Sequence, residues 1–211
     1  MDVAPPVNSL HRAVLPLSFY RRADVTAIAQ DLLGKCLFTR IGNSLTGGFI
    51  TETESYGGVD DKACHAYNGR RTKRTEVMFA PGGVAYVYLC YGVHSLFNVV
   101  TYQRNHPHAV LIRALSPTIG LQTMLQRRSK KNLCPTLTIG PGTVTQALGI
   151  TTAHTGFSLL GPVLWIEDHN IPVPQSAIIA SPRVGVGYAE EDALLPWRFR
   201  LDPSYATRVW K

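Results

Sequence analysis

Two glutamates and a tyrosine alternate in the segment ITETESY, and this spacing is the most informative chemical pattern in the chain. Successive side chains of a strand point to opposite faces, so Ile50, Glu52, Glu54 and Tyr56 would share one face. A carboxylate fixed near a strand end can hold and polarise a water as a general base, beside an aromatic platform. The same pattern also fits an exposed polar face next to a tyrosine, and the residues alone leave both interpretations open.

A basic cluster follows in the segment NGRRTKRT. It contains Arg70, Arg71, Lys73 and Arg74 among small polar residues, whose backbone groups suit contacts to phosphate. Charge runs of this kind are usually solvated, but this one lies between the carboxylate segment and a strongly aromatic one. We therefore expect the cluster to contact the phosphates of a nucleic acid.

The aromatic segment is YVYLCYGVH, at residues 86–94. A strand here would place Tyr86, Tyr88 and Cys90 on one face and Tyr91 at a turn marked by Gly92. Alternating tyrosines often serve only cross-strand packing. The alternative is functional, because a tyrosine on the strand can stack on an extruded base and an aromatic at a hairpin tip can wedge between base steps.

The remaining motifs argue against several other chemistries. The seven histidines show neither an H-E-x-x-H motif nor cysteines at zinc spacing, so we expect no metal and no cofactor. Phosphate-binding glycine loops of nucleotide-binding proteins are also missing from the sequence. The glycine-rich residues 183–187 are too short for such a loop, and we expect them to let the backbone approach a ligand closely.

Hydrophobic spacing predicts the elements that must position these residues. A helix should begin after Asp24 and close at Gly34, and two more should cover 118–128 and 143–148. Strands are predicted at 35–40, 48–54, 84–91, 96–101, 109–115, 163–167, 177–186 and 197–201. The class is mixed α/β (α+β) with a largely antiparallel sheet. We expect a single domain over 1–211 with an irregular leader at 1–15.

Composition narrows the partner and the compartment. Lysine and arginine number 21 against 14 aspartates and glutamates, a net charge of +7 that favours a polyanionic partner. No apolar run is long enough to span a membrane, and the N-terminus lacks the pattern of a secretory signal. The cysteines are too sparse for a disulfide scaffold. These features predict a cytoplasmic, nucleoid-associated or nuclear protein with reduced thiols.

Several long segments together resemble the alkyladenine (3-methyladenine) DNA glycosylase family. They are ETESY at 52–56, DKACHAYNGRRTKR at 61–74, MFAPGGVAYVYLCYGVHSLFNV at 78–99, VLIRALSP at 110–117, GPGTVTQALGI at 140–150 and PRVGVGYA at 182–189. The likeness runs in order from about residue 17 to about residue 201. It implies a curved antiparallel sheet with flanking helices and a protruding β-hairpin that inserts into DNA.

The resemblance also implies a role for particular residues. Glu54 would be the general base and Arg113 would help it to hold the nucleophilic water. The base pocket would comprise Tyr56, His65, Tyr88, Asn98, Leu111 and Val186, and DNA would be contacted by Tyr91, Met78 and the basic cluster. The family usually has alanine where this chain has Ser55, a departure that bears on substrate preference more than on the reaction.

The implied activity is that of a monomeric, monofunctional DNA repair glycosylase. Such an enzyme flips an alkylated or deaminated purine of the 3-methyladenine, 7-methylguanine, hypoxanthine or ethenoadenine class out of double-stranded DNA. A glutamate-activated water then hydrolyses the N-glycosidic bond and leaves an abasic site. Two other interpretations remain open at this point, a non-catalytic nucleic-acid binding module and a metal-dependent hydrolase.

Overall fold

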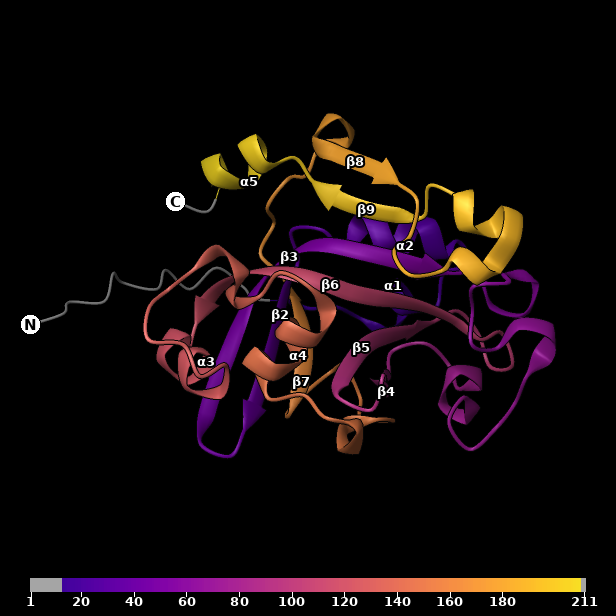
Figure 1. Ribbon diagram of the computed structural model, residues 1–211, viewed down its shortest axis with the longest axis horizontal. Coiled ribbons are helices and arrows are strands. Elements are labelled where there is room, and N and C mark those ends of the chain that lie inside the picture. Colours follow the sequence, from indigo (N-terminus) through magenta and orange to yellow (C-terminus); the bar gives the residue numbers. More distant parts are fainter. Residues whose placement is uncertain (1–12, 210–211) are drawn as a thin grey trace, which may run out of the picture.

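The structure is a computed structural model that describes residues 13–209 (Figure 1). One nine-stranded sheet has the order β1-β7-β2-β3-β6-β5-β4, and a β8–β9 hairpin joins it through β9 and β3. All of its strand pairs are antiparallel, which confirms the predicted class. The strands are β1 (Ala13–Val14), β2 (Cys36–Ile41), β3 (Ser44–Tyr56), β4 (Ala85–Cys90), β5 (His94–Thr101), β6 (His108–Ile119), β7 (Leu164–Asp168), β8 (Ile178–Ser181) and β9 (Arg198–Leu201).

The long strands β3 and β6 form the spine of this sheet, and β3 changes partners along its length. Its first half pairs with β2 and residues 52–54 pair with β9, so the sheet branches and curls around β3. The β3–β6 pairing skips Thr51 on one strand and Arg113 on the other. Bulges of this kind bend a strand and re-aim its side chains. Both lie next to Glu52, so the spine is distorted where the candidate catalytic residues sit.

The helices are α1 (Leu17–Tyr20), α2 (Val25–Asp31), α3 (Leu121–Arg127), α4 (Pro141–Leu148) and α5 (Pro203–Val209). As predicted, α2 starts at Asp24, whose carboxylate accepts the backbone N–H groups of Thr26 and Ala27 at 2.9 Å. The main apolar core joins side chains of α2, α3 and α4 to the sheet. No helix in residues 13–209 is long and apolar enough to cross a membrane.

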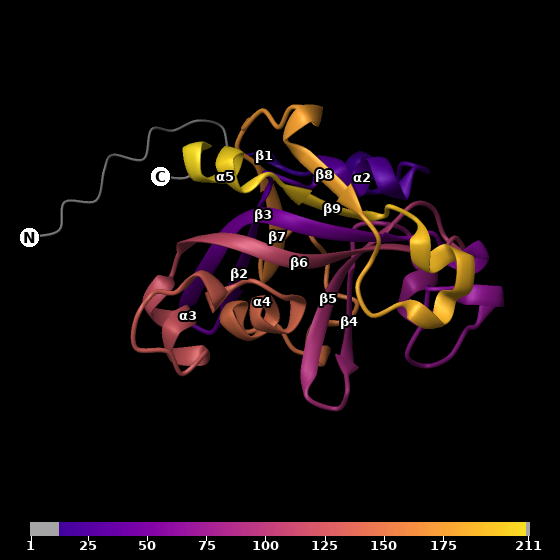
Figure 2. The ribbon, with the colours of Figure 1, turned by 45° about the horizontal axis from the view of Figure 1, so that its top comes forward.

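The hairpin of β4 and β5 extends away from the body of the protein (Figure 2). At its turn, Tyr91 and Gly92 have φ values of 50° and 70°, in the left-handed region that is strained for a tyrosine. The Tyr91 side chain is 91% exposed and Val93 is 73% exposed. The predicted protruding hairpin is therefore present, with an aromatic side chain at its tip.

Some predicted boundaries are wrong. The end of the expected irregular leader, residues 13–15, includes β1, and residues 17–20, for which no element was predicted, form α1. Both are held because Leu15 and Tyr20 are buried in the core, while 1–12 lie outside the described residues. Strand β6 continues to Ile119, so the helix expected from 118 begins at Leu121. The strand expected over 177–186 ends at Ser181, and α5 was not predicted.

Candidate active site

A row of paired residues crosses the sheet where β3, β6, β5 and β4 are neighbours. Glu54 pairs with Leu111, Leu111 with Asn98, and Asn98 with Tyr86. Paired residues on adjacent strands point to the same face, and three strand spacings amount to roughly 14 Å. Glu54 and Tyr86 therefore stand at opposite ends of a floor that is wide enough for a purine.

The Glu54 carboxylate is fully buried and held by three donors from three segments. The Val184 N–H donates to Oε1 at 2.8 Å, and the Tyr56 hydroxyl donates to Oε2 at 2.9 Å. Arg113 places Nη1 3.3 Å from Oε1. A carboxylate has about four lone-pair positions, so these contacts leave one acceptor position on Oε2.

Burial and charge act on Glu54 in opposite directions. Burial raises the pKa of its carboxyl above the usual value, while Arg113, the Val184 N–H and the Tyr56 hydroxyl lower it again. The pKa of Arg113 is raised although burial disfavours its charge, because Glu54 and Glu52 both stabilise the guanidinium. For Glu54 the net result is a raised pKa, with burial as the largest cause.

Glu52 shares a face with Glu54, as the alternation predicts, but it is used differently. Its Oε1 accepts Nε of Arg113 at 2.9 Å and Nε of Arg198 at 2.6 Å. Two arginines therefore neutralise this carboxylate and link Glu52 on β3 to β6 and β9. Glu54 is the less neutralised of the two, and its donors Tyr56, Arg113 and Val184 all line the neighbouring cavity. The structure therefore separates two glutamates that the alternation leaves equivalent.

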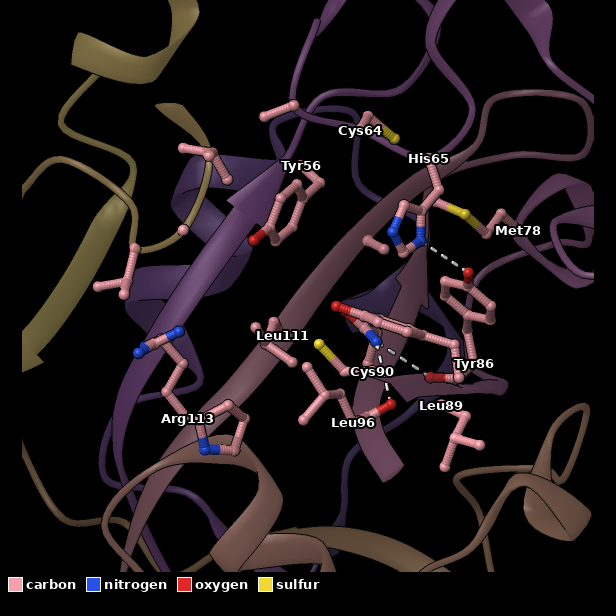
Figure 3. Close-up of a pocket in the computed structure, with 18 of the residues that line it drawn as sticks. Tyr56, Cys64, His65, Met78, Tyr86, Leu89, Cys90, Leu96, Leu111 and Arg113 are labelled. Carbon is pink, nitrogen blue, oxygen red and sulfur yellow. Dashed lines mark hydrogen bonds between the residues drawn. The ribbon is translucent and has the colours of Figure 1, made fainter. Parts of the chain in front are cut away.

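A cavity of about 450 Å³ lies over the Leu111 floor. Tyr56 and Arg113 lie on one side of it, and His65, Met78 and Tyr86 face them from the other (Figure 3). Tyr88, Asn98 and Val186 also line it, so the predicted pocket residues all meet here. The Asn98 amide nitrogen donates to the backbone carbonyls of Tyr86 and Leu96 at 3.2 and 3.4 Å. This fixes the side chain at the floor of the cavity.

His65 is held as a neutral ring in the cavity wall. Its Nδ1 lies 2.8 Å from the Tyr86 hydroxyl, and Nε2 lies 2.8 Å from the Arg74 guanidinium. The same Arg74 nitrogen lies 3.3 Å from Nδ1, and because arginine can only donate, the ring is the acceptor in this contact. Burial and the neighbouring cations Arg74 and Arg70 lower the pKa of His65 to about 4. The ring therefore carries no charge at neutral pH.

The four cations of the basic cluster have different surroundings. Arg70 and Lys73 are exposed and form no ion pair within the described part of the chain. Arg71 makes a two-pronged pair with Glu76, at 2.8 and 2.7 Å. Arg74 turns inward, with its guanidinium 5.1 Å from the centre of the Tyr88 ring. Only two of the four are thus free to meet phosphates without first giving up a partner.

Met78 and Ser55 lie where the expectations from sequence did not place them. Met78, expected at the DNA surface, is only 2% exposed and belongs to the cavity wall, so only a base inside the cavity could reach it. Ser55 is fully buried and its hydroxyl donates to the carbonyl of Trp197 at 3.4 Å. It does not line the cavity.

Sequence reasoning singled out the segment 183–187 but missed the roles of Arg183 and Val184 within it. Val184 follows the buried Arg183, whose guanidinium binds the Asp61 carboxylate at 2.6 and 2.9 Å. The glycine-rich pattern at 183–187 did predict a close approach of backbone, but the group it approaches is the Glu54 carboxylate. Within residues 13–209 no group of three or more His, Cys, Asp or Glu side chains is placed to hold a metal ion, and none of the four cysteines, all of them in this range, forms a disulfide.

Comparison with known proteins finds a consistent set of relatives. A sequence model described as methylpurine-DNA glycosylase matches residues 18–204. A Chlamydia felis protein is 50% identical over 93% of this chain and its own full length. Proteins of Bacillus mycoides and Desulfitobacterium hafniense are 46% and 42% identical, over 87% and 90% of this chain and 94% and 96% of their own lengths. All three relatives are provisionally named as 3-methyladenine DNA glycosylases.

Proposed function

The chain belongs to the methylpurine-DNA glycosylase family, and on that premise we propose how its own residues perform the reaction. It is an enzyme that hydrolyses N-glycosyl bonds of methylated purines in DNA. We propose that the damaged nucleotide is flipped into the cavity above Leu111, where a water activated by Glu54 releases the base and leaves an abasic site. The observation that carries this proposal is the buried Glu54 carboxylate, held by three donors beside an aromatic cavity.

The proposed mechanism uses the free acceptor position on Glu54. A water held there and by the Arg113 guanidinium would lose its proton to the carboxylate as it attacks C1′ of the sugar. Cleavage of a glycosidic bond passes through an oxocarbenium-like state, which the negative charge of Glu54 stabilises. Backbone groups near Val186, which is buried at the cavity edge, would complete the binding of the water.

We propose that the base pocket selects damaged purines in two ways, by stacking on its aromatic rings and by the fixed Asn98 side chain at its floor. Tyr56 on one side, and His65 and Tyr88 with ring centres 4.5 Å apart on the other, would enclose the flipped base. Flipping costs least for a base that pairs or stacks poorly. The fixed Asn98 side chain would crowd a normal guanine amino group. The substrates we propose are 3-methyladenine, 7-methylguanine, hypoxanthine and ethenoadenine.

The neutral state of His65 bears on how the base leaves. A cationic base such as 3-methyladenine needs no further proton, but hypoxanthine is neutral and leaves better when protonated. With a pKa of about 4 and its ring already accepting from Arg74, His65 is a poor proton donor at neutral pH. We therefore assign protonation of neutral bases to solvent.

The rim of the cavity supplies the proposed contacts to DNA. Tyr91 at the hairpin tip would fill the gap left in the duplex, and Arg70 and Lys73 would bind phosphates. We further propose that the protein acts as a monomer on double-stranded DNA in the nucleoid or nucleus. Its net charge of +7 favours association with this polyanion.

We also propose that the enzyme is monofunctional and does not nick the strand. Strand cleavage through a Schiff base needs a neutral amine. Lys62 and Lys73 are the lysines beside the cavity motifs. Lys62 binds Glu190 and Glu191 at 2.5 and 2.8 Å, and these bonds raise the pKa of its ammonium group. Borohydride trapping should therefore give no Lys62-dependent crosslink to lesion DNA, and a crosslink in an amount comparable to turnover would contradict the water mechanism.

The decisive experiment compares the two glutamates. Base release from duplexes that contain 3-methyladenine, hypoxanthine or ethenoadenine is measured in single turnover and revealed by alkaline cleavage at abasic sites. Glu54→Gln should slow release by about 100-fold to 10,000-fold and leave lesion binding nearly intact, because an amide cannot accept the proton. Glu52→Gln is the matched control, with a smaller expected loss. A loss below about tenfold for Glu54→Gln would overturn the assignment.

A further inference from the structure

A buried ion pair lies behind Glu54, outside the cavity. The side chains of Arg183 and Asp61 are 0% and 1% exposed. Arg183 binds both Asp61 oxygens and also donates to the carbonyls of Ser55 and Asp192, each at 3.0 Å. Four of its five N–H groups are thus used, whereas Nε has no partner among the described residues. Burying a charge is costly, and these hydrogen bonds offset part of that cost for both members of the pair.

The pair connects the three segments that surround the base pocket. Asp61 accepts the N–H groups of Gly57 and Ala63 at 2.9 Å, which fixes the loop that leads from β3 to His65. Arg183 anchors the segment after β8 to the end of β3 through the Ser55 carbonyl. Its guanidinium also lies 5.0 Å from the centre of the Tyr56 ring.

Two of the three donors to Glu54 depend on these contacts. Val184, whose N–H reaches Oε1, is the residue that follows Arg183. Tyr56, whose hydroxyl reaches Oε2, has its ring against the Arg183 guanidinium. Trp197, whose ring centre is 5.1 Å from the same guanidinium, supports it on a further side. Arg113 alone reaches Glu54 independently of the pair.

We propose that the Asp61–Arg183 pair is a positioning device for the general base: it holds the Val184 N–H and the Tyr56 hydroxyl on the Glu54 carboxylate. Neither member lines the cavity, so both act through Glu54 and not on the substrate. The inference rests on the proposed role of Glu54 as the base.

The expected consequence is a change in the proton affinity of Glu54. The charged and titratable groups around it are Glu52 and Tyr56 on β3, Arg113 on β6, Arg198 on β9 and the Asp61–Arg183 pair. Hydrogen bonds to the ionised form lower a carboxyl pKa by roughly one unit each. Loss of the two positioned donors should therefore raise the pKa of Glu54 further and move the acidic limb of the rate profile to higher pH.

The test measures Glu54 directly and without a substrate. Full-length protein with carboxyl-labelled glutamate is titrated by carbon NMR, and Glu54→Gln assigns the signal. Arg183→Lys keeps the charge but loses the two-pronged geometry, and it should raise the Glu54 midpoint by about one pH unit. The matched control is Arg22→Lys, since Arg22 also binds a carboxylate (Asp31) and an aromatic ring (Phe19) but lies away from the cavity. It should leave the midpoint unchanged.

A second variant covers the case in which Arg183→Lys fails to fold. The double substitution Asp61→Asn with Arg183→Met removes both charges together, which proteins tolerate better than one unpaired charge. It should show the same upward shift. An unchanged midpoint in a folded variant would make the pair merely structural and overturn the proposal. In the wild type, absence of base release with a normal Glu54 titration would contradict the proposed function alone, so the two failures are distinguishable.

Discussion

The two sides of the cavity differ in how completely their polar groups are bonded. On the Glu54 side, the carboxylate and its partners Arg113, Tyr56 and Val184 are tied together before any substrate is present. On the rim that we propose to face DNA, Tyr91 is 91% exposed and the cations Arg70 and Lys73 form no ion pair in the described residues. One side is organised for chemistry and the other is open to a partner.

This difference indicates how the protein divides its binding energy. A transition state is stabilised best by groups that need no rearrangement when charge develops, so a fully bonded wall suits catalysis. Contacts to a long polyanion are many, individually weak and sensitive to salt, so exposed side chains on a loop and a hairpin tip suit recognition. Substitutions on the wall should therefore change rates, and substitutions on the rim should change affinity.

The largest expected effect is on the wall. Arg113→Lys would lose the guanidinium that bridges Glu52 and Glu54, and base release in single turnover should fall by about 100-fold, the effect of removing one preorganised donor. Affinity for lesion DNA should stay within about twofold. Arg198→Lys is the control, because Arg198 binds Glu52 but has no bond to Glu54. Equal losses for the two variants would break the distinction between the glutamates.

Stability at low pH probes the buried state of His65. Its pKa is about 4 in the folded protein and about 6.5 when unfolded, so the unfolded state binds more protons between these values. Its contribution to stability is therefore lost as the pH falls from about 6.5 towards 4. The free energy of unfolding, measured in urea, should fall between pH 7 and pH 4.5 in both proteins. The fall should be about 2 kcal/mol smaller in His65→Gln than in the wild type. Parallel losses in both proteins would mean that His65 is solvated.

The hairpin tip should affect binding alone. Tyr91→Ala removes a side chain that is 91% exposed, so thermal stability should not change. Affinity for lesion duplexes should fall by about tenfold, since stacking on a base contributes on the order of 1 to 3 kcal/mol. Leu160→Ala, at another exposed apolar position, serves as the control in fluorescence anisotropy. Unchanged affinity in Tyr91→Ala would remove the tip from the DNA interface.

The smallest expected effect is on the salt dependence of DNA affinity when single cations of the basic cluster are removed. Arg70→Ala and Lys73→Ala should each lower the slope of log affinity against log salt by about 0.9, the value for one phosphate contact. Arg71→Ala should lower it less, because Arg71 is already neutralised by Glu76. Binding of lesion and undamaged duplex should weaken equally. A uniform decrease for all three would show that the Arg71–Glu76 pair opens on DNA.

Local patterns were sufficient for much of the fold. The cap at Asp24, the alternation from Glu52 to Tyr56 and the turn at Tyr91–Gly92 depend on a few adjacent residues, and each was predicted correctly. Residues 13–20 and 203–209 were missed because short elements carry little periodicity and gain their stability from burial against distant strands. The strand predicted over 177–186 ended early because Val184 turns to bond Glu54.

The sequence by itself determined which chemical groups the protein has and the strand faces on which they lie. Alternation put Glu52 and Glu54 on one face but could not rank them, since both lie between small hydroxyl-bearing residues. Tertiary structure distinguished them, by placing two arginines on Glu52 and a buried backbone N–H on Glu54. It also paired Asp61 with Arg183, which are 122 residues apart. Proton affinity depends on burial and on such distant partners, and neither can be deduced from local periodicity.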